Sequence, residues 1–230
     1  MPAHLLTGAT SGIGEQLAVA LHERGDDLVL LARDEEKAAG LASRFPGCHT
    51  VVVDLGEPDR IPAAVSSADL PDALDSVVHS AGVVDVAEVG DTDPASLGRT
   101  VVVNLVAPMA LTRALLHHVR RGRGTHLFVN SGSGIRANAG WASYNASKFG
   151  LRGFAEALGQ EEAAHGVRVS SVFPGRTATP MQEQVHAQEG KDYDPTAWIR
   201  PETVVATILQ VLDLPRDATI PEVLVRPGPG

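Results

Sequence analysis

A tyrosine and a lysine stand four positions apart in the run SYNASKFG, as Tyr144 and Lys148. On a helix, side chains at i and i+4 lie on one face a turn apart, so the phenol and the ammonium would be close together. A cation beside a phenol favours the phenolate and lowers the pKa of the tyrosine from its usual value of about 10. Such a tyrosine exchanges protons near neutral pH, as a general acid must. The alternative is an ordinary helix with a half-buried tyrosine and an exposed lysine.

A glycine-rich run, TGATSGIG, occupies residues 7–14 and follows a short apolar stretch. Glycines at positions 8, 12 and 14 permit a tight turn and close approach of the backbone. A helix that starts here would offer its first amide hydrogens to a pyrophosphate. The spacing differs from the commoner G-x-G-x-x-G pattern, and alone the run is also compatible with a turn that holds no ligand.

The elements that must position these residues are short apolar runs separated by longer amphipathic segments. Continuous apolar runs indicate strands buried on both faces, and segments such as 14–24 and 35–44 have the length of crossover helices. We therefore expect an α/β fold with a doubly wound parallel sheet of about seven strands and helices on both faces. The expected strands are residues 4–6, 27–32, 50–55, 74–82, 125–132, 167–175 and 222–227.

Length and composition predict one soluble domain over residues 1–230. A net charge of −9 argues against a nucleic-acid or anionic-membrane binder, and we read the basic cluster Arg120, Arg121 and Arg123 as a helix end closed by glycine. A single cysteine, Cys48, excludes an internal disulfide and fits a reducing compartment. No apolar run reaches the ~20 residues of a membrane span, and no metal-ligand spacing occurs. The predicted location is the cytoplasm.

Together these features resemble the short-chain dehydrogenase/reductase family from Thr7 to at least Met181. The resemblance implies a Rossmann-type fold with a single dinucleotide-binding and catalytic domain. Two positions depart from the family, because His79 and Ser80 replace the usual asparagines of its N-A-G element. The matching positions are the glycine run at 7–14, Asp54, SAG at Ser80, Ala81 and Gly82, Asn104, Tyr144, Lys148, Pro174, Gly175 and Thr179.

The resemblance implies a catalytic set of Asn104, Ser131, Tyr144 and Lys148. In that set Ser131 would polarise a substrate carbonyl and Tyr144 would protonate its oxygen, while a nicotinamide gives the carbon a hydride. The family's S-x-x-G spacing before the tyrosine selects Ser131, and Ser133 is a minor alternative.

Asn104 lies in the apolar run VVVNLVAPMALTRALL, four residues before Pro108. Proline lacks the N–H that would bond the carbonyl of Asn104, so we expect a distorted helix and a free carbonyl there. The family resemblance implies that this carbonyl holds a water connected to Lys148. A solvated helix bend is the alternative.

The resemblance also implies NADP(H) as cofactor. Ala32 stands where members that prefer NAD carry an acid, and Arg33 can pair with a 2′-phosphate, although Ser11 replaces a second basic residue of the family's glycine turn. Asp34 fits a helix N-cap better than a ribose ligand. The implied cofactor-binding residues are Gly8, Thr10, Ser11, Gly12, Ile13, Gly14, Arg33, Asp54, Leu55, Ser80, Ala81, Gly82, Tyr144, Lys148, Pro174, Gly175, Thr177 and Thr179.

Three further features concern the substrate and the assembly. Arg136 and Trp141 lie in the loop expected to border the substrate, where Trp141 is either a recognition or a packing residue. Residues 180–200 are polar and without pattern, and we expect them to form a substrate lid. Residues 101–116 are apolar nearly all round. The resemblance implies a homodimer or homotetramer through such helices, and a thickly covered monomer core is the alternative.

The predicted function is reduction of a ketone or aldehyde by NADPH, or the reverse alcohol oxidation. The same fold could instead serve as a non-catalytic NADP(H)-binding redox sensor, or as a structural subunit. The tyrosine and lysine together favour chemistry, because a sensor has no need of a proton donor.

Overall fold

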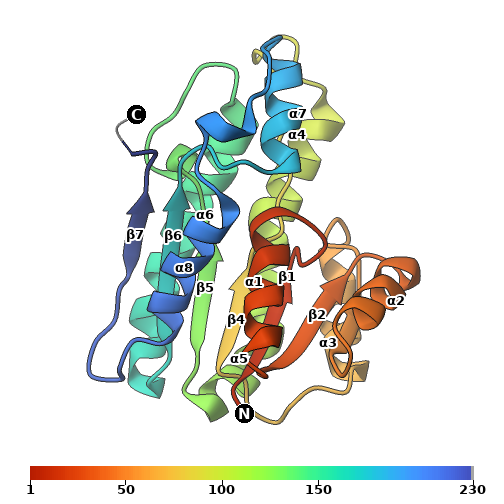
Figure 1. The fold of residues 1–230 in the computed structure, drawn as a ribbon, viewed down its shortest axis with the longest axis vertical. Helices are drawn as coiled ribbons and strands as arrows, with labels where there is room; N and C mark the ends of the chain where they lie inside the picture. The colour runs from red at the N-terminus through yellow and green to blue at the C-terminus, as the bar shows by residue number, and fades with distance from the viewer. Residues whose placement is uncertain (229–230) are drawn as a thin grey trace.

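The computed structural model describes residues 1–228 and contains one seven-stranded sheet (Figure 1). The strand order is β3-β2-β1-β4-β5-β6-β7, and every neighbouring pair is parallel. The chain winds outward from β1 in one direction and then from β4 in the other, which confirms the predicted doubly wound sheet. The strands are β1 (Ala3–Thr7), β2 (Asp27–Ala32), β3 (His49–Val52), β4 (Ser76–His79), β5 (Thr125–Val129), β6 (Arg168–Pro174) and β7 (Glu222–Val225).

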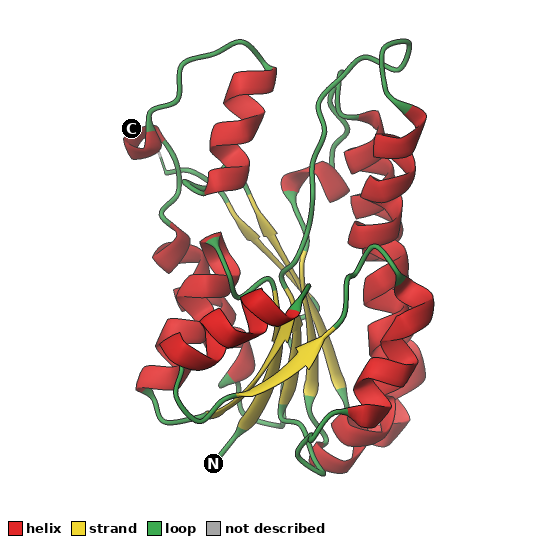
Figure 2. Ribbon diagram, turned by 90° about the vertical axis from the view of Figure 1, so that its right-hand side faces the viewer, coloured by secondary structure: helices red, strands yellow, loops and turns green. Residues whose placement is uncertain are grey.

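Helices cover both faces of the sheet (Figure 2). The helices α1, α2 and α8 pack on one face, and α3, α5 and α6 pack on the other. All residues of the central strands β1, β4 and β5 are buried, which explains their continuous apolar character. The helices are α1 (Gly12–Glu23), α2 (Glu35–Arg44), α3 (Ile61–Ser67), α4 (Pro94–Val101), α5 (Ala107–Gly122), α6 (Ala142–Glu162), α7 (Pro180–Gln188) and α8 (Pro201–Leu212).

A π-turn, η2 (Val102–Val106), joins α4 to α5 and contains Asn104. The amide of Ala107 bonds back to the carbonyl of Val102, five residues earlier, and Pro108 follows in the first turn of α5. Because Pro108 has no amide hydrogen, the regular bond to the carbonyl of Asn104 is absent. The predicted helix distortion at this position is therefore confirmed.

The helical stretch Pro94–Gly122 is long and apolar enough to cross a membrane, by length and composition alone. Its 29 residues contain a window with mean hydropathy 1.4, of which 44% is buried. In the described structure the stretch packs against the sheet, α3 and α6, which is the position of a core helix.

The segment 180–200 is not the patternless loop that the sequence indicated. Its first part is α7, and a 3-10 turn, η5 (Pro195–Ala197), follows. The hydroxyl of Thr179 caps α7 by accepting a bond from the amide of Gln182 at 3.3 Å. Figure 1 shows α7 beyond the carboxyl ends of the strands, on the same side as α4.

Candidate active site

A cavity of about 680 Å³ opens at the carboxyl ends of the central strands. It joins the glycine-rich turn after β1 to the region of Ser131, Tyr144 and Lys148. Ligands of doubly wound sheets bind at this edge, where the strand order reverses. The implied cofactor residues that line it are Gly8, Thr10, Ser11, Gly12, Ile13, Gly14, Ser80, Ala81, Gly82, Tyr144, Lys148, Pro174, Gly175, Thr177 and Thr179.

Three implied cofactor residues do not line this cavity: Arg33, Asp54 and Leu55. They follow β2 and β3, which continue the same edge of the sheet. The carboxylate of Asp54 accepts a bond from the amide of Gly56 at 2.7 Å, so part of its role is to shape its own turn. Arg33 is exposed, and its Nε lies 3.2 Å from the carboxylate of Asp34.

The glycine turn has the shape of a phosphate cradle. Gly8 has a φ of +75°, and a Cβ on it would lie 2.8 Å from the amide nitrogen of Ala81. A Cβ on Gly14 would overlap the carbonyl of Gly8. The N-cap residue of α1, Ser11, makes no side-chain capping bond, so the amides of the first turn keep their capacity for an anion. The residues present therefore fit a dinucleotide pyrophosphate.

Tyr144 and Lys148 lie on one face of α6, as their spacing predicted. Both side chains are buried, and Lys148 Nζ is 5.7 Å from the centroid of the Tyr144 ring. Nζ donates a hydrogen bond to the carbonyl of Val129 at 3.0 Å. The ammonium group of Lys148 therefore lies between the tyrosine ring and the end of β5.

The predicted lowering of the pKa of Tyr144 is wrong. Burial raises the pKa of Tyr144 above its usual value, and hydrogen bonding with the Ser131 side chain opposes this rise. Burial also lowers the pKa of Lys148 to about 8. Both pKa values shift because a site with little water disfavours the charged form of each group.

The contact with Tyr144 distinguishes the two candidate serines. Both Ser131 and Ser133 line the cavity, but Ser131 is the one whose side-chain hydrogen bonding lowers the pKa of Tyr144. Its hydroxyl also accepts a bond from the amide of Ser133 at 3.1 Å and so fixes the turn after β5. This geometry favours Ser131, as the S-x-x-G spacing did.

Asn130 is a positioning residue that the sequence reasoning missed. Its side-chain oxygen accepts a bond from the amide of Ser131 at 2.9 Å, and its Nδ2 donates to the carbonyl of Lys148 at 3.2 Å. One buried amide thus ties β5 to α6 next to both reactive residues. The available signal was a polar residue at the end of an apolar strand.

Asn104 lies behind the cavity and does not line it. Its side chain bonds both backbone groups of Val83 at 2.8 Å and donates to Ser147 Oγ at 3.2 Å. The side chain of Asn104 therefore connects η2 to the loop after β4 and to α6 by hydrogen bonds. The water expected at its backbone carbonyl stays a prediction.

Of the unusual pair His79 and Ser80, the first lies in the core and the second lines the cavity. His79 is buried and stacks on Phe128 with a centroid separation of 4.6 Å, while its Nε2 lies 3.3 Å from Thr112 Oγ1. Burial lowers the pKa of His79 well below its usual value. Only Ser80 faces the cavity, so only this substitution bears on the ligand site.

Of the two predicted substrate residues, Trp141 lines the cavity, at the end away from the glycine turn, and Arg136 does not line it. Trp141 packs edge to face on Tyr144 with a centroid separation of 5.7 Å, whereas Arg136 is exposed outside the lining. The remaining lining residues at this end, most of which the sequence did not single out, are Val84, Asn138, Ala139, Arg176, Pro180, Met181, Gln182, Val185 and Glu189.

The fold is a doubly wound parallel sheet, and its cavity joins a glycine turn to a buried tyrosine and lysine. A family model described as short chain dehydrogenase matches residues 3–190. The chain therefore belongs to the short chain dehydrogenase family, and it is an oxidoreductase of that family.

Individual relatives and solved structures agree with this membership. An uncharacterized oxidoreductase of Staphylococcus aureus strain MW2 is 27% identical over 227 residues, which cover 97% of this chain and 96% of the relative. A short chain dehydrogenase of Escherichia coli CFT073, solved with NADPH, is 27% identical at a TM-score of 0.87, with 97% of this chain and 95% of that chain covered. A metagenomic short-chain oxidoreductase solved with NADP is 28% identical at a TM-score of 0.80, with 99% and 97% covered.

Proposed function

We propose that the protein interconverts a ketone or aldehyde and the corresponding alcohol with NADP(H). The observation that carries this proposal is the convergence of the Tyr144 and Ser131 side chains, with Lys148 behind them, in the cavity that the glycine turn also lines. A redox sensor would need only the glycine turn. The buried side chains of Tyr144 and Lys148 favour an enzyme, because burying polar groups costs free energy that ligand binding alone does not require.

Each of the catalytic residues would have a distinct task. Ser131 donates a hydrogen bond to the substrate oxygen, and Tyr144 gives that oxygen its proton. When bound, the nicotinamide supplies the hydride. Lys148 in its protonated form stabilises the phenolate that Tyr144 becomes. The free carbonyl of Asn104 would hold the water that returns a proton from solvent.

The preference for NADPH rests on the end of β2. Ala32 offers no carboxylate to repel a phosphate, and the next residue, Arg33, is exposed at the edge of the sheet. Its partner Asp34 is already engaged as the N-cap of α2, because its Oδ1 accepts a bond from the amide of Lys37 at 2.8 Å. An exposed pair of this kind is worth little, so Arg33 can turn to a 2′-phosphate at small cost.

The test is to measure carbonyl-dependent oxidation of NADPH and NADH over a panel of ketones and aldehydes. We expect activity with NADPH and a preference over NADH of roughly ten- to a hundred-fold. Arg33→Ala should remove most of that preference. Arg44→Ala is the matched control, since Arg44 sits at the other end of α2 and pairs with Glu15. Equal use of both cofactors would contradict the assignment of Arg33, and intact NADPH binding without any turnover would favour the sensor.

We also propose a cytoplasmic homodimer or homotetramer that associates through α5 and α6. Val106, Met109 and Phe149 are large apolar residues with about two fifths of their surface exposed on this side of the molecule. Light scattering in solution would decide between this assembly and a monomer. The segment 180–200 is proposed to move as a lid over the substrate end of the cavity.

A further inference from the structure

The substrate end of the cavity carries two charged residues on otherwise mostly apolar walls. Three charged side chains occur in the described lining: Lys148 near the reactive hydroxyls, and Arg176 and Glu189 at the far end. Arg176 is the second residue after β6, and Glu189 directly follows α7. A charged residue in a small-molecule cavity usually fixes the orientation of a ligand. Arg176 and Glu189 are therefore candidates for contact with the substrate.

The guanidinium of Arg176 is held in a defined plane and is only partly satisfied. It lies 5.8 Å from the centroid of Trp141 and 5.4 Å from that of Trp198, in a cation–π arrangement with both. Its Nη2 donates to Glu189 Oε1 at 2.6 Å, which is its one hydrogen bond among residues 1–228. The side chain is 29% exposed. Its other N–H groups are therefore available to an incoming acceptor.

Glu189 does not depend on Arg176 alone. Its second oxygen lies 3.1 Å from Lys191 Nζ, so one carboxylate is shared by two cations. Glu189 therefore keeps Lys191 as a partner when Arg176 binds another anion.

The position of Trp141 sets how far that anion lies from the reacting carbonyl. The indole ring contacts both residues, with centroid separations of 5.7 Å from the Tyr144 ring and 5.8 Å from Arg176 Cζ. A substrate that bonds both Tyr144 and Arg176 would lie along this indole. We therefore expect its acceptor group to be several bonds away from the carbonyl carbon.

We propose that Arg176 anchors a carboxylate of the substrate, and that the protein acts on oxo acids whose carboxylate is several bonds from the carbonyl. This inference rests on the proposed carbonyl reduction and adds the substrate class. The carboxylate takes no part in the chemistry. The hydride goes to the carbonyl carbon, the proton to its oxygen, and the nicotinamide is oxidised as in the parent reaction.

Binding tests the inference without turnover, because the two tryptophans of the chain, Trp141 and Trp198, are the two rings that contact Arg176. Titrating 5-oxohexanoate into the full protein with NADP⁺ present should change the tryptophan fluorescence saturably, since no reduction occurs with the oxidised cofactor. The methyl ester and 2-oxohexanoate should bind at least ten-fold more weakly. Equal binding of acid and ester by the wild type would overturn the proposal.

Variants then separate anchoring from a structural role. Arg176→Met keeps an apolar stem without the guanidinium, and we expect it to bring the acid-to-ester ratio of both affinity and kcat/KM close to one. Arg200→Met, which removes an exposed cation outside the lining, should keep the ratio. If Arg176→Met lowers affinity and kcat/KM equally for the acid and the ester, the acid-to-ester ratio is unchanged. That result would show a structural role for Arg176 and overturn the proposal. Selective acid binding without turnover in the presence of NADPH would instead count against the proposed reductase.

Discussion

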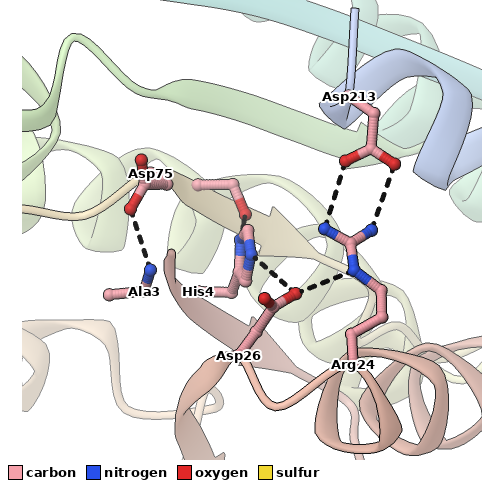
Figure 3. A network of polar contacts seen from close by, with 7 residues as sticks. Ala3, His4, Arg24, Asp26, Asp75 and Asp213 are labelled. Atoms are coloured by element: carbon pink, nitrogen blue, oxygen red, sulfur yellow. Dashed lines mark hydrogen bonds and ion pairs between the residues drawn. The ribbon is translucent and has the colours of Figure 1, made fainter. Parts of the chain in front are cut away.

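Two clusters of polar residues occupy opposite edges of the same sheet, and the cavity described above opens at one of them. At the amino edge, His4 Nδ1 lies 2.7 Å from Ser76 Oγ, and His4 Nε2 lies 3.5 Å from Asp26 (Figure 3). At the carboxyl edge, Ser131, Tyr144 and Lys148 form the candidate active site. The residue types at the amino edge are those of a serine, histidine and aspartate catalytic set.

The difference between the edges is whether a substrate can reach the polar groups. At the amino edge Ser76 is fully buried, and Arg24 closes the cluster by pairing with Asp26 at 3.1 Å and with the exposed Asp213. The amide of Ala3 is likewise bonded by Asp75 at 2.8 Å (Figure 3). Burial lowers the pKa of His4, against the opposing effect of the Asp26 carboxylate. Suitable residue types therefore make a reactive site only where a cavity lets a substrate reach them.

The largest expected effect comes from removing the proton donor at the carboxyl edge. Tyr144→Phe should lower kcat for carbonyl reduction by at least about a hundred-fold, because only the acid is lost. Fold and NADPH affinity should stay nearly unchanged. Tyr193→Phe is the matched control, since it alters the other tyrosine of the chain outside the cavity lining. Turnover above about a tenth of wild type in Tyr144→Phe would contradict the role of this residue.

A second prediction concerns pH. With a pKa of about 8, Lys148 loses its proton as the pH rises through that value. The pKa of Tyr144 is raised, so the acid itself stays protonated over this range. We therefore expect kcat for reduction to fall about ten-fold per pH unit above pH 8, because the neutral amine no longer stabilises the phenolate. Saturating NADPH keeps cofactor binding out of the measurement, and a flat profile from pH 7 to 9.5 would be the contrary result.

The smallest effect on activity is expected at the amino edge, where the change is in stability. Asp26→Asn breaks a pair whose carboxylate is 6% exposed and should lower the free energy of unfolding by about 1.5–3 kcal/mol. Asp213→Asn removes the other partner of the same arginine, but its carboxylate is 55% exposed, so the loss should be under about 1 kcal/mol. Urea unfolding measures both. A loss of kcat in folded Asp26→Asn would mean that the two edges are coupled.

Sequence patterns predicted the elements whose signals are local. The strand 27–32 and the helix 35–44 agree with β2 and α2 to the residue, because an apolar run and an Asp34 N-cap define them without help from the rest of the chain. The run 50–55 was too long, since β3 ends at Val52 and Asp54 turns to its own loop. Helix α7 was missed because tertiary contacts at the cavity hold its short and largely polar sequence.

The end of α5 shows why some backbone choices are not local. The sequence predicted glycine as the residue that closes the helix, yet Arg123 adopts the left-handed conformation with a φ of +48°. Gly122 and Gly124 are needed for another purpose, because a Cβ on either would overlap the carbonyl of Leu74. In the candidate site, too, the residues marked by local motifs were predicted and those that meet only in the folded chain were not. The family's motifs located Tyr144 and Ser131, whereas Arg176 and Glu189 meet only through the folded chain.

The π-turn at Val102–Val106 makes the two halves of the long helix differ in phase. One added residue rotates everything that follows by about 100° about the axis, since an α-helix has 3.6 residues per turn. Removing a single residue from this turn would restore the regular ladder and turn α4 relative to α5 by that angle. The amide of Asn104 would then swing away from Val83 and Ser147. In this helix a one-residue deletion therefore amounts to a rotation, and its effect would reach α6 although no residue of α6 had changed.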